Sequence, residues 1–147
     1  MDQAALVGIR SDWYDRLRDG GGRLLAGLRT GGLDVRAAGW VQSESDREWH
    51  LYLVSPAVEA GRAGDGYGVV ESVLRSLDAP WLLLDDIKLI GPSDPLARGL
   101  LGETNHASGA GGAPVVVTGD YIGTVPIVGP AYIYPVPKPA QAPATGS

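Results

Sequence analysis

The chain has no cysteine and no phenylalanine, and only two histidines occur among its 147 residues. Without cysteine, disulfide bonds, thiol catalysis and every cysteine-ligated metal site are excluded. His50 and His106 lie far apart in the sequence, so neither belongs to a two-histidine zinc motif. We therefore expect no metal and no cofactor, and a chain without cysteine is compatible with a reducing cytoplasm.

Positive charge is also scarce. The chain has 12 Lys and Arg residues against 17 Asp and Glu residues, a formal net charge of −5. Proteins that bind duplex nucleic acid attract phosphates through basic patches, and the sequence shows none, so we expect no duplex partner. Asp2 stands where a signal peptide needs bases, and no window approaches the roughly 18 apolar residues of a membrane helix. These features predict a soluble cytoplasmic protein.

Length and composition favour one globular domain. Hydrophobic residues make up 44% of the chain and charged residues 20%, which is typical of folded proteins. The last residues are rich in proline and alanine and cannot bury enough apolar surface to offset the entropy of ordering. We expect a single domain at 1–134 and a disordered tail at 135–147.

Hydrophobic periodicity predicts an α+β fold. A first helix is expected from the N-cap Ser11 to Gly31, either broken at Gly20–Gly22 or held there by packing. The other expected elements are strands at 33–42 and 48–55, a helix at 65–77, a strand at 86–90, a helix from Pro95, and short strands at 115–118, 121–125 and 131–134. This order predicts a small mixed or antiparallel sheet with two to three helices packed mainly on one face.

Asp86 and Lys88 are the candidates for enzymatic chemistry. Residues two apart on a strand share one face, and an acid and a lysine so placed can hold Mg²⁺ and position a water. The alternative interpretation is that the two charges neutralise each other on a solvated face of the sheet or protect its edge. The nearest further acids, Glu71 and Asp78, are expected on a helix or its end. We expect no catalytic activity and keep a metal-dependent hydrolase or nuclease as the alternative.

Tryptophan and tyrosine form the other distinctive group. Their rings combine an apolar body with a polar group and favour half-wet surfaces. Trp40, Trp49 and Tyr52 lie on the predicted hairpin, both faces of which carry apolar residues. An exposed apolar face attracts a partner, although the same rings would also suit a core. We expect a non-enzymatic interaction or accessory domain that binds a protein partner, or a second copy, through this aromatic sheet surface.

A glycine-rich segment, 61–68, opens the helix expected at 65–77. Helix N-termini bind phosphate, but this segment matches neither G-x-G-x-x-G nor a P-loop, and Asp65 would repel an anion. The second alternative is that the protein is a small-ligand sensor, with the ligand bound in a cleft between the sheet and this helix.

The hairpin, the helix after it and the segment 86–98 (DIKLIGPSDPLAR) resemble a group of small bacterial proteins with no assigned activity. The late sequence 131–135 (AYIYP) fits the same resemblance. It implies a bacterial cytoplasmic domain of α+β type. The shared motif is structural, so it assigns no functional residue to this chain.

Overall fold

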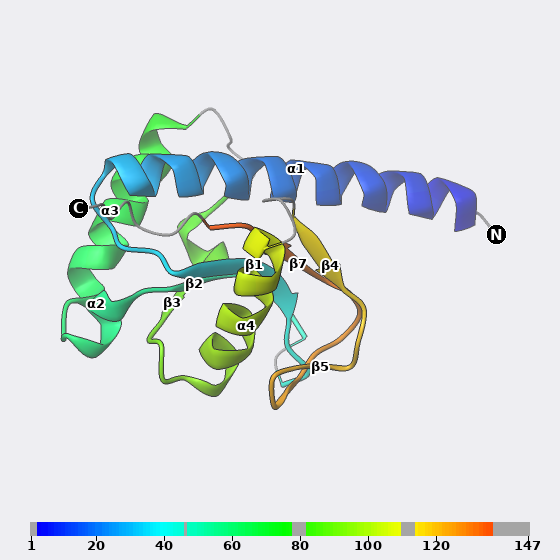
Figure 1. The fold of residues 1–147 in the computed structure, drawn as a ribbon. Coiled ribbons are helices and arrows are strands. Elements are labelled where there is room, and N and C mark those ends of the chain that lie inside the picture. The colour runs from blue at the N-terminus through cyan, green and yellow to red at the C-terminus, as the bar shows by residue number, and fades with distance from the viewer. Residues whose placement is uncertain (1–2, 46, 78–81, 110–113, 137–147) are drawn as a thin grey trace.

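The computed structural model describes residues 3–45, 47–77, 82–109 and 114–136 (Figure 1). Its helices are α1 (Gln3–Thr30), α2 (Pro56–Glu59), α3 (Ala63–Ser76) and α4 (Pro95–Gly109), with a 3₁₀ turn, η1, at Leu84–Asp86. Its strands are β1 (Ala37–Gln42), β2 (Trp49–Val54), β3 (Ile87–Ile90), β4 (Val115–Val117), β5 (Tyr121–Ile122), β6 (Val125–Pro126) and β7 (Ala131–Tyr134). The predicted α+β class and the short C-terminal strands are confirmed.

Five strands form one mixed sheet in the order β3-β2-β1-β7-β4. β1 and β2 make the predicted hairpin, with Ala37 opposite Val54 and Gln42 opposite Trp49. β7 pairs antiparallel with both β1 and β4, whereas β2 and β3 run parallel. Parallel neighbours need a crossover connection, and α2 and α3 supply it. The sheet is therefore mixed, as predicted.

The strand predicted at 121–125 is instead a small hairpin. β5 pairs with β6, and Tyr121 lies opposite Pro126. Between them Gly123 has a φ of 59°, a backbone conformation that favours glycine. Helix α4 approaches closely here, because a Cβ at Gly99 would overlap the backbone of Ile122 and Gly123. The alternating pattern of side chains does not reveal so short a turn.

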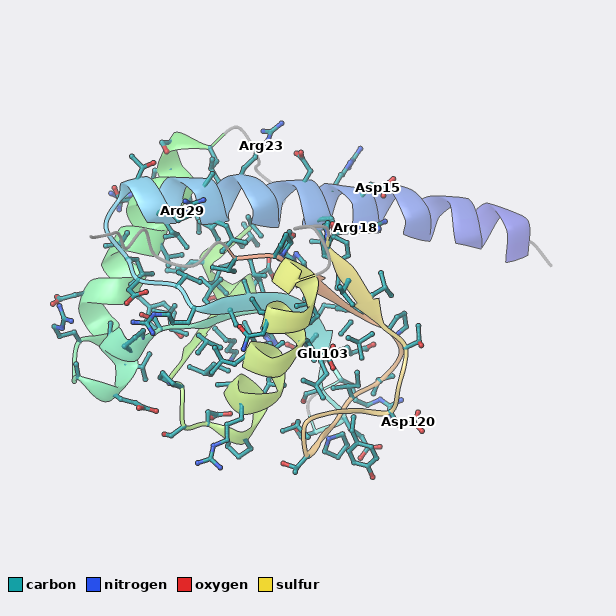
Figure 2. All side chains as sticks on the ribbon, viewed as in Figure 1. Asp15, Arg18, Arg23, Arg29, Glu103 and Asp120 are labelled. Carbon is teal, nitrogen blue, oxygen red and sulfur yellow. The ribbon has the colours of Figure 1, made fainter. Side chains whose placement is uncertain are left out.

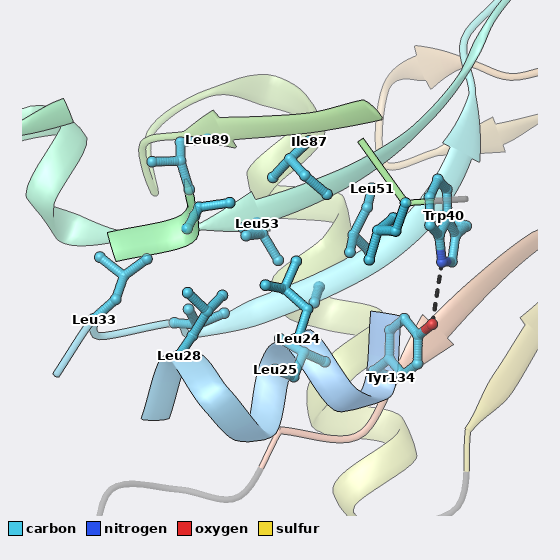
Figure 3. Close-up of a cluster of buried hydrophobic side chains, with 14 of the residues drawn as sticks. Leu24, Leu25, Leu28, Leu33, Trp40, Leu51, Leu53, Ile87, Leu89 and Tyr134 are labelled. Carbon is cyan, nitrogen blue, oxygen red and sulfur yellow. Dashed lines mark hydrogen bonds between the residues drawn. The ribbon is translucent and has the colours of Figure 1, made fainter. Parts of the chain in front are cut away.

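The central hairpin is buried on both faces. Leu51 and Leu53 pack in one core with α1 and α3 (Figure 3), while Tyr52 and Val54 pack in a second core with α4. Helices α1 and α3 thus lie on one face of the sheet, and α4 covers the opposite face. The physical reason is that each apolar face contributes about 25 cal/mol per Å² when it is removed from water.

Helix α1 begins before the predicted cap and crosses the glycine run without a break. It starts at Gln3, so Ser11 is not its first residue. No proline stops a helix there, and Ala4, Ala5 and Leu6 are strong helix formers. Glycine costs about 1 kcal/mol against alanine inside a helix, so packing has to hold the segment Gly20–Gly22.

Gly21 lets α1 lie directly on two buried rings. The Trp40 indole donates to the Leu17 carbonyl oxygen at 2.9 Å, and the Tyr134 hydroxyl donates to that of Arg18 at 2.7 Å. Trp40 also donates to the Tyr134 hydroxyl at 3.1 Å (Figure 3). A Cβ at position 21 would overlap that hydroxyl, so only glycine fits. We call these two rings and two carbonyls the α1 clamp.

Gly21→Ala tests the clamp. Alanine is the better helix former, but its Cβ has to displace Tyr134, and overpacking of this kind costs about 2 kcal/mol. Gly22→Ala is the matched control: the nearest atom to its Cβ is 3.8 Å away, and we expect it to raise stability by up to about 1 kcal/mol. Urea unfolding measures both variants. A Gly21→Ala protein as stable as the wild type would contradict the clamp.

Helix α4 begins at a turn that ties it to α2. Asp94 caps the helix, since its Oδ1 accepts from the Leu96 amide at 2.9 Å, and Pro95 occupies the first position. Ser93, the residue before the cap, donates its hydroxyl and its amide to the Glu59 carboxylate. These two hydrogen bonds hold the pKa of Glu59 below its ordinary value.

The Glu59–Ser93 contact predicts a pH dependence. Because the folded pKa of Glu59 is lowered, its contribution to stability is present above the unfolded value of about 4.3 and is lost as pH falls through the folded pKa. A double-mutant cycle of Glu59→Gln and Ser93→Ala, followed by urea unfolding, should therefore show a coupling energy at pH 7 that is smaller at pH 3. Coupling that is equal at both pH values would exclude the ionised hydrogen bond.

The last strand and the first helix place the two ends of the described chain differently relative to the sheet. The predicted domain boundary at 134 coincides with the last residue of β7, and most of the predicted tail, residues 137–147, lies outside the described residues. At the other end, α1 extends past the sheet toward the N-terminus (Figure 1). Within the described ranges, no helix combines the length and the apolar character needed to cross a membrane.

Candidate functional site

The three predicted binding residues do not share one exposed face. Trp40 is 3% exposed in the core under α1, and Tyr52 is 8% exposed in the core against α4, with its ring edge-on to His50. Neighbouring strand residues that differ by an odd number point to opposite faces, which places Tyr52 away from Trp49. The single aromatic surface expected from the sequence is therefore corrected, because Trp40 and Tyr52 are buried on opposite sides of the sheet.

Trp40 and Trp49 nevertheless line one cavity on the α1 side of the sheet. Trp40 lies opposite Tyr132 of β7, and Tyr132 lies opposite Val116 of β4, so these three residues form a row across the strands. The cavity above this row has a volume of about 110 Å³. We call it the tryptophan pocket, and it is lined by Leu17, Arg18, Trp40, Trp49, Val116, Pro130, Ala131 and Tyr132.

The lining of the tryptophan pocket is apolar apart from Arg18. Its guanidinium lies 5.2 Å from the centre of the Tyr132 ring and forms an ion pair with Asp15 at 2.6 Å. Burial raises the pKa of Tyr132, and Arg18 opposes that rise. Val116, at the rim, is 53% exposed. The pocket thus has an apolar floor, one cation and an open edge at β4, where Arg18 lies between α1 and β4 (Figure 2).

The α1 clamp forms the floor of this pocket. Trp40 belongs to both, and its indole is fixed by two hydrogen bonds. Burial raises the pKa of Tyr134 far above its ordinary value, so its hydroxyl keeps its proton and remains a donor to the Arg18 carbonyl. The position of Trp40 is therefore set before any ligand arrives.

Asp86 has a local structural role. It ends η1 rather than lying within the strand, and its Oδ2 accepts from the Leu83 amide at 3.0 Å. Lys88 follows on β3, an edge strand, where it is exposed. Among the described residues there is no group of three His, Asp or Glu side chains that could hold a metal ion. Of the two further acids considered, Glu71 lies on α3 and pairs with Arg75, and Asp78 lies outside the described residues.

The remaining candidates also have packing roles. His50 is 6% exposed in β2. In the glycine-rich segment, Gly66 faces β3, where a Cβ would lie 2.8 Å from Leu89, so this glycine allows α3 to approach the strand. A cavity of about 180 Å³ lies between the first turn of α3 and the loop after α1, with Asp34, Arg62 and Asp65 in its wall. The small-ligand interpretation of that region stays a prediction.

Sequence reasoning identified two members of the tryptophan pocket and missed the rest. Tyr132 belonged to the aromatic set, but its partner across the sheet is set by the order β1-β7-β4, which no local pattern encodes. Helix α1 contributes Leu17 and Arg18 to the pocket. The edge strand β4 contributes Val116, and the loop before β7 contributes Pro130. Residues 115–117 are three valines, so the sequence carries no alternation that marks which of them faces the pocket.

Asp86→Ala separates a structural role from a catalytic one. We expect a loss of about 1 kcal/mol in unfolding free energy, because the Leu83 amide loses its acceptor. Asp85→Ala is the matched control, since Asp85 is exposed and makes no hydrogen bond within the described ranges. Urea unfolding gives the comparison. Equal stability of the two variants, together with Mg²⁺-dependent nucleic-acid cleavage lost only in Asp86→Ala, would instead favour the metal-dependent alternative.

Comparisons of the chain with protein-family models, curated proteins and solved structures found no match. A functional assignment therefore has to come from the geometry of the site. The resemblance of segment 86–98 to small bacterial proteins stays a prediction.

Proposed function

We propose that this protein is a non-enzymatic interaction domain that binds a protein partner by accepting one apolar side chain in the tryptophan pocket. The observation that carries the proposal is the pocket itself: two tryptophans and a tyrosine from three strands enclose an apolar space that is open at the sheet edge. Interfaces are enriched in such aromatic anchors, and their energy concentrates in desolvated pockets.

The size of the pocket suits one side chain. An apolar cavity of about 150 Å³ stays dry and binds benzene, and the tryptophan pocket, at about 110 Å³, is of the same order. Burying a leucine- or phenylalanine-sized group contributes roughly 1.5–3 kcal/mol. That is enough for an anchor residue and too little for a complete interface, so the partner has to make further contacts around the rim.

The rigidity of the floor supports binding without rearrangement. Trp40 is held by the Leu17 carbonyl and by Tyr134, and both acceptors belong to buried parts of the fold. A wall that is already ordered loses little further conformational entropy when a ligand binds, which is the advantage of preorganisation.

Peptide selection tests the proposal. A phage-displayed library of random heptapeptides is panned against the full chain, and the enriched peptides are synthesised and titrated by fluorescence anisotropy. We expect the enriched peptides to share an apolar residue. Trp49→Ala should weaken binding at least about ten-fold, since loss of a hot-spot ring costs roughly 2 kcal/mol or more. Val116→Asp, which changes only the exposed rim, should weaken it similarly.

Tyr121→Ala is the matched control, because Tyr121 is a 59% exposed ring on β5 that does not line the pocket. It should bind every peptide as the wild type does. Urea unfolding first establishes that all variants fold. If no peptide is enriched, or if the enriched peptides bind equally well to Trp49→Ala, Val116→Asp and the wild type, the proposed function is wrong.

A further inference from the structure

A groove continues from the tryptophan pocket along the side of α1. The two share Arg18 and Tyr132, and the groove has a volume of about 650 Å³. One wall is α1 and the other is the end of β7 with the chain that follows it. Arg18, Arg23 and Arg29 line it on the α1 side, and Tyr132, Tyr134 and Pro135 line it on the other side.

The α1 wall of the groove has two arginines at its ends. Arg18, Gly22, Leu25 and Arg29 are spaced by three or four residues, so they form one line along the helix. At 1.5 Å per residue, Arg18 and Arg29 are separated by about 16 Å along the axis. An extended peptide rises about 3.3 Å per residue, so roughly five residues span this distance.

The groove is locally positive in an acidic chain. Its lining includes three arginines and a single acid, Asp19, whereas the whole protein has a net charge of −5. Arg23 is paired with Asp19 at 3.1 Å, and Arg18 with Asp15 at 2.6 Å. Arg29 is exposed, and within the described residues no ion pair to it is found. Arg29 therefore adds a positive charge to this wall of α1 that favours an anion there.

We propose that the groove binds a short acidic segment of the partner, about five residues long and extended, next to the apolar residue that enters the tryptophan pocket. This inference rests on the proposed function and adds the charge of the partner to it. Complementary charge along an interface raises specificity and the association rate more than it raises affinity. Residues 137–147 of this chain contain no acid, so its own C-terminal segment does not have this chemistry.

A single-stranded nucleic acid is the competing polyanion, because it also uses arginines and stacking rings. Two observations favour the peptide. The positive wall spans only the Arg18–Arg29 stretch, and a longer phosphate chain would continue over the acidic remainder of the surface. The tryptophan pocket is a concave apolar cavity of about 110 Å³, which is the size of one aliphatic or aromatic side chain, whereas bases stack on the faces of aromatic rings along a groove.

The experiment extends the heptapeptide selection on the full chain. Each enriched peptide is compared with a version in which every Asp and Glu is replaced by Asn or Gln. We expect acids beside the apolar residue, and binding about ten-fold weaker for the amide version. Arg29→Glu should weaken binding by about ten-fold, since like charges across an interface repel. Raising NaCl from about 50 mM to about 500 mM should weaken wild-type binding and affect Arg29→Glu less.

Arg75→Glu is the matched control, because it makes the same charge change on the exposed face of α3, where Arg75 pairs with Glu71. It should bind as the wild type does. Neutral enriched peptides, or equal effects of Arg29→Glu and Arg75→Glu, would overturn the acidic partner; loss of binding in Trp49→Ala would then still support the proposed function. Acidic peptides that bind Trp49→Ala normally would overturn the pocket and keep the charged groove.

Two further outcomes complete the test. If no peptide is enriched, the proposed function and this inference both fall. If a fluorescein-labelled ten-nucleotide deoxythymidine strand binds more tightly than the best peptide and loses affinity in Arg29→Glu, the groove binds single-stranded nucleic acid and the acidic-peptide inference is wrong.

Discussion

The arrangement depends on the contact between two buried rings and the backbone of α1. Polar atoms of Trp40 and Tyr134 have to be satisfied when they are buried, and the carbonyls of Leu17 and Arg18 satisfy them. The same contact fixes α1 on the sheet, sets the floor of the tryptophan pocket and places Arg18 at the junction of pocket and groove. The packing of α1, the floor of the tryptophan pocket and the position of Arg18 therefore depend on one set of hydrogen bonds, and this set needs the absence of a side chain at Gly21.

The sheet explains why the pocket lies at one edge. Helices α1 and α3 cover one face and α4 covers the other, so most apolar side chains of the central strands are buried. The row from Trp40 through Tyr132 ends at β4, where Val116 is exposed. At the opposite edge, β3 presents Lys88, a charge that discourages pairing with another strand. The two edges of the sheet thus differ in chemistry.

Local patterns in the sequence predicted the elements better than the site. The hairpin, the β3 strand and the Asp94–Pro95 helix start were predictable, because alternation and capping act within a few residues. Helices on both faces of the sheet were not predicted, although apolar residues on both sides of β2 indicated that both faces are buried. Trp40, Trp49 and Tyr52 were grouped as one binding surface, although strand alternation already places Tyr52 on the face opposite Trp49. The pairing of β7 with β1 places Tyr132 beside Trp40. This pairing joins parts of the chain that are far apart in sequence, so no local pattern predicts it.

Gly21 also constrains how this sequence can diverge. A methyl group there and a phenol at position 134 cannot occupy the same space, so a substitution at one site has to be accompanied by a smaller residue at the other. Homologues should therefore show covariation between a small residue in the middle of the first helix and an aromatic residue at the end of the last strand. A tryptophan in the first strand would complete this three-position signature, by which distant members of the lineage can be recognised even where overall identity has been lost.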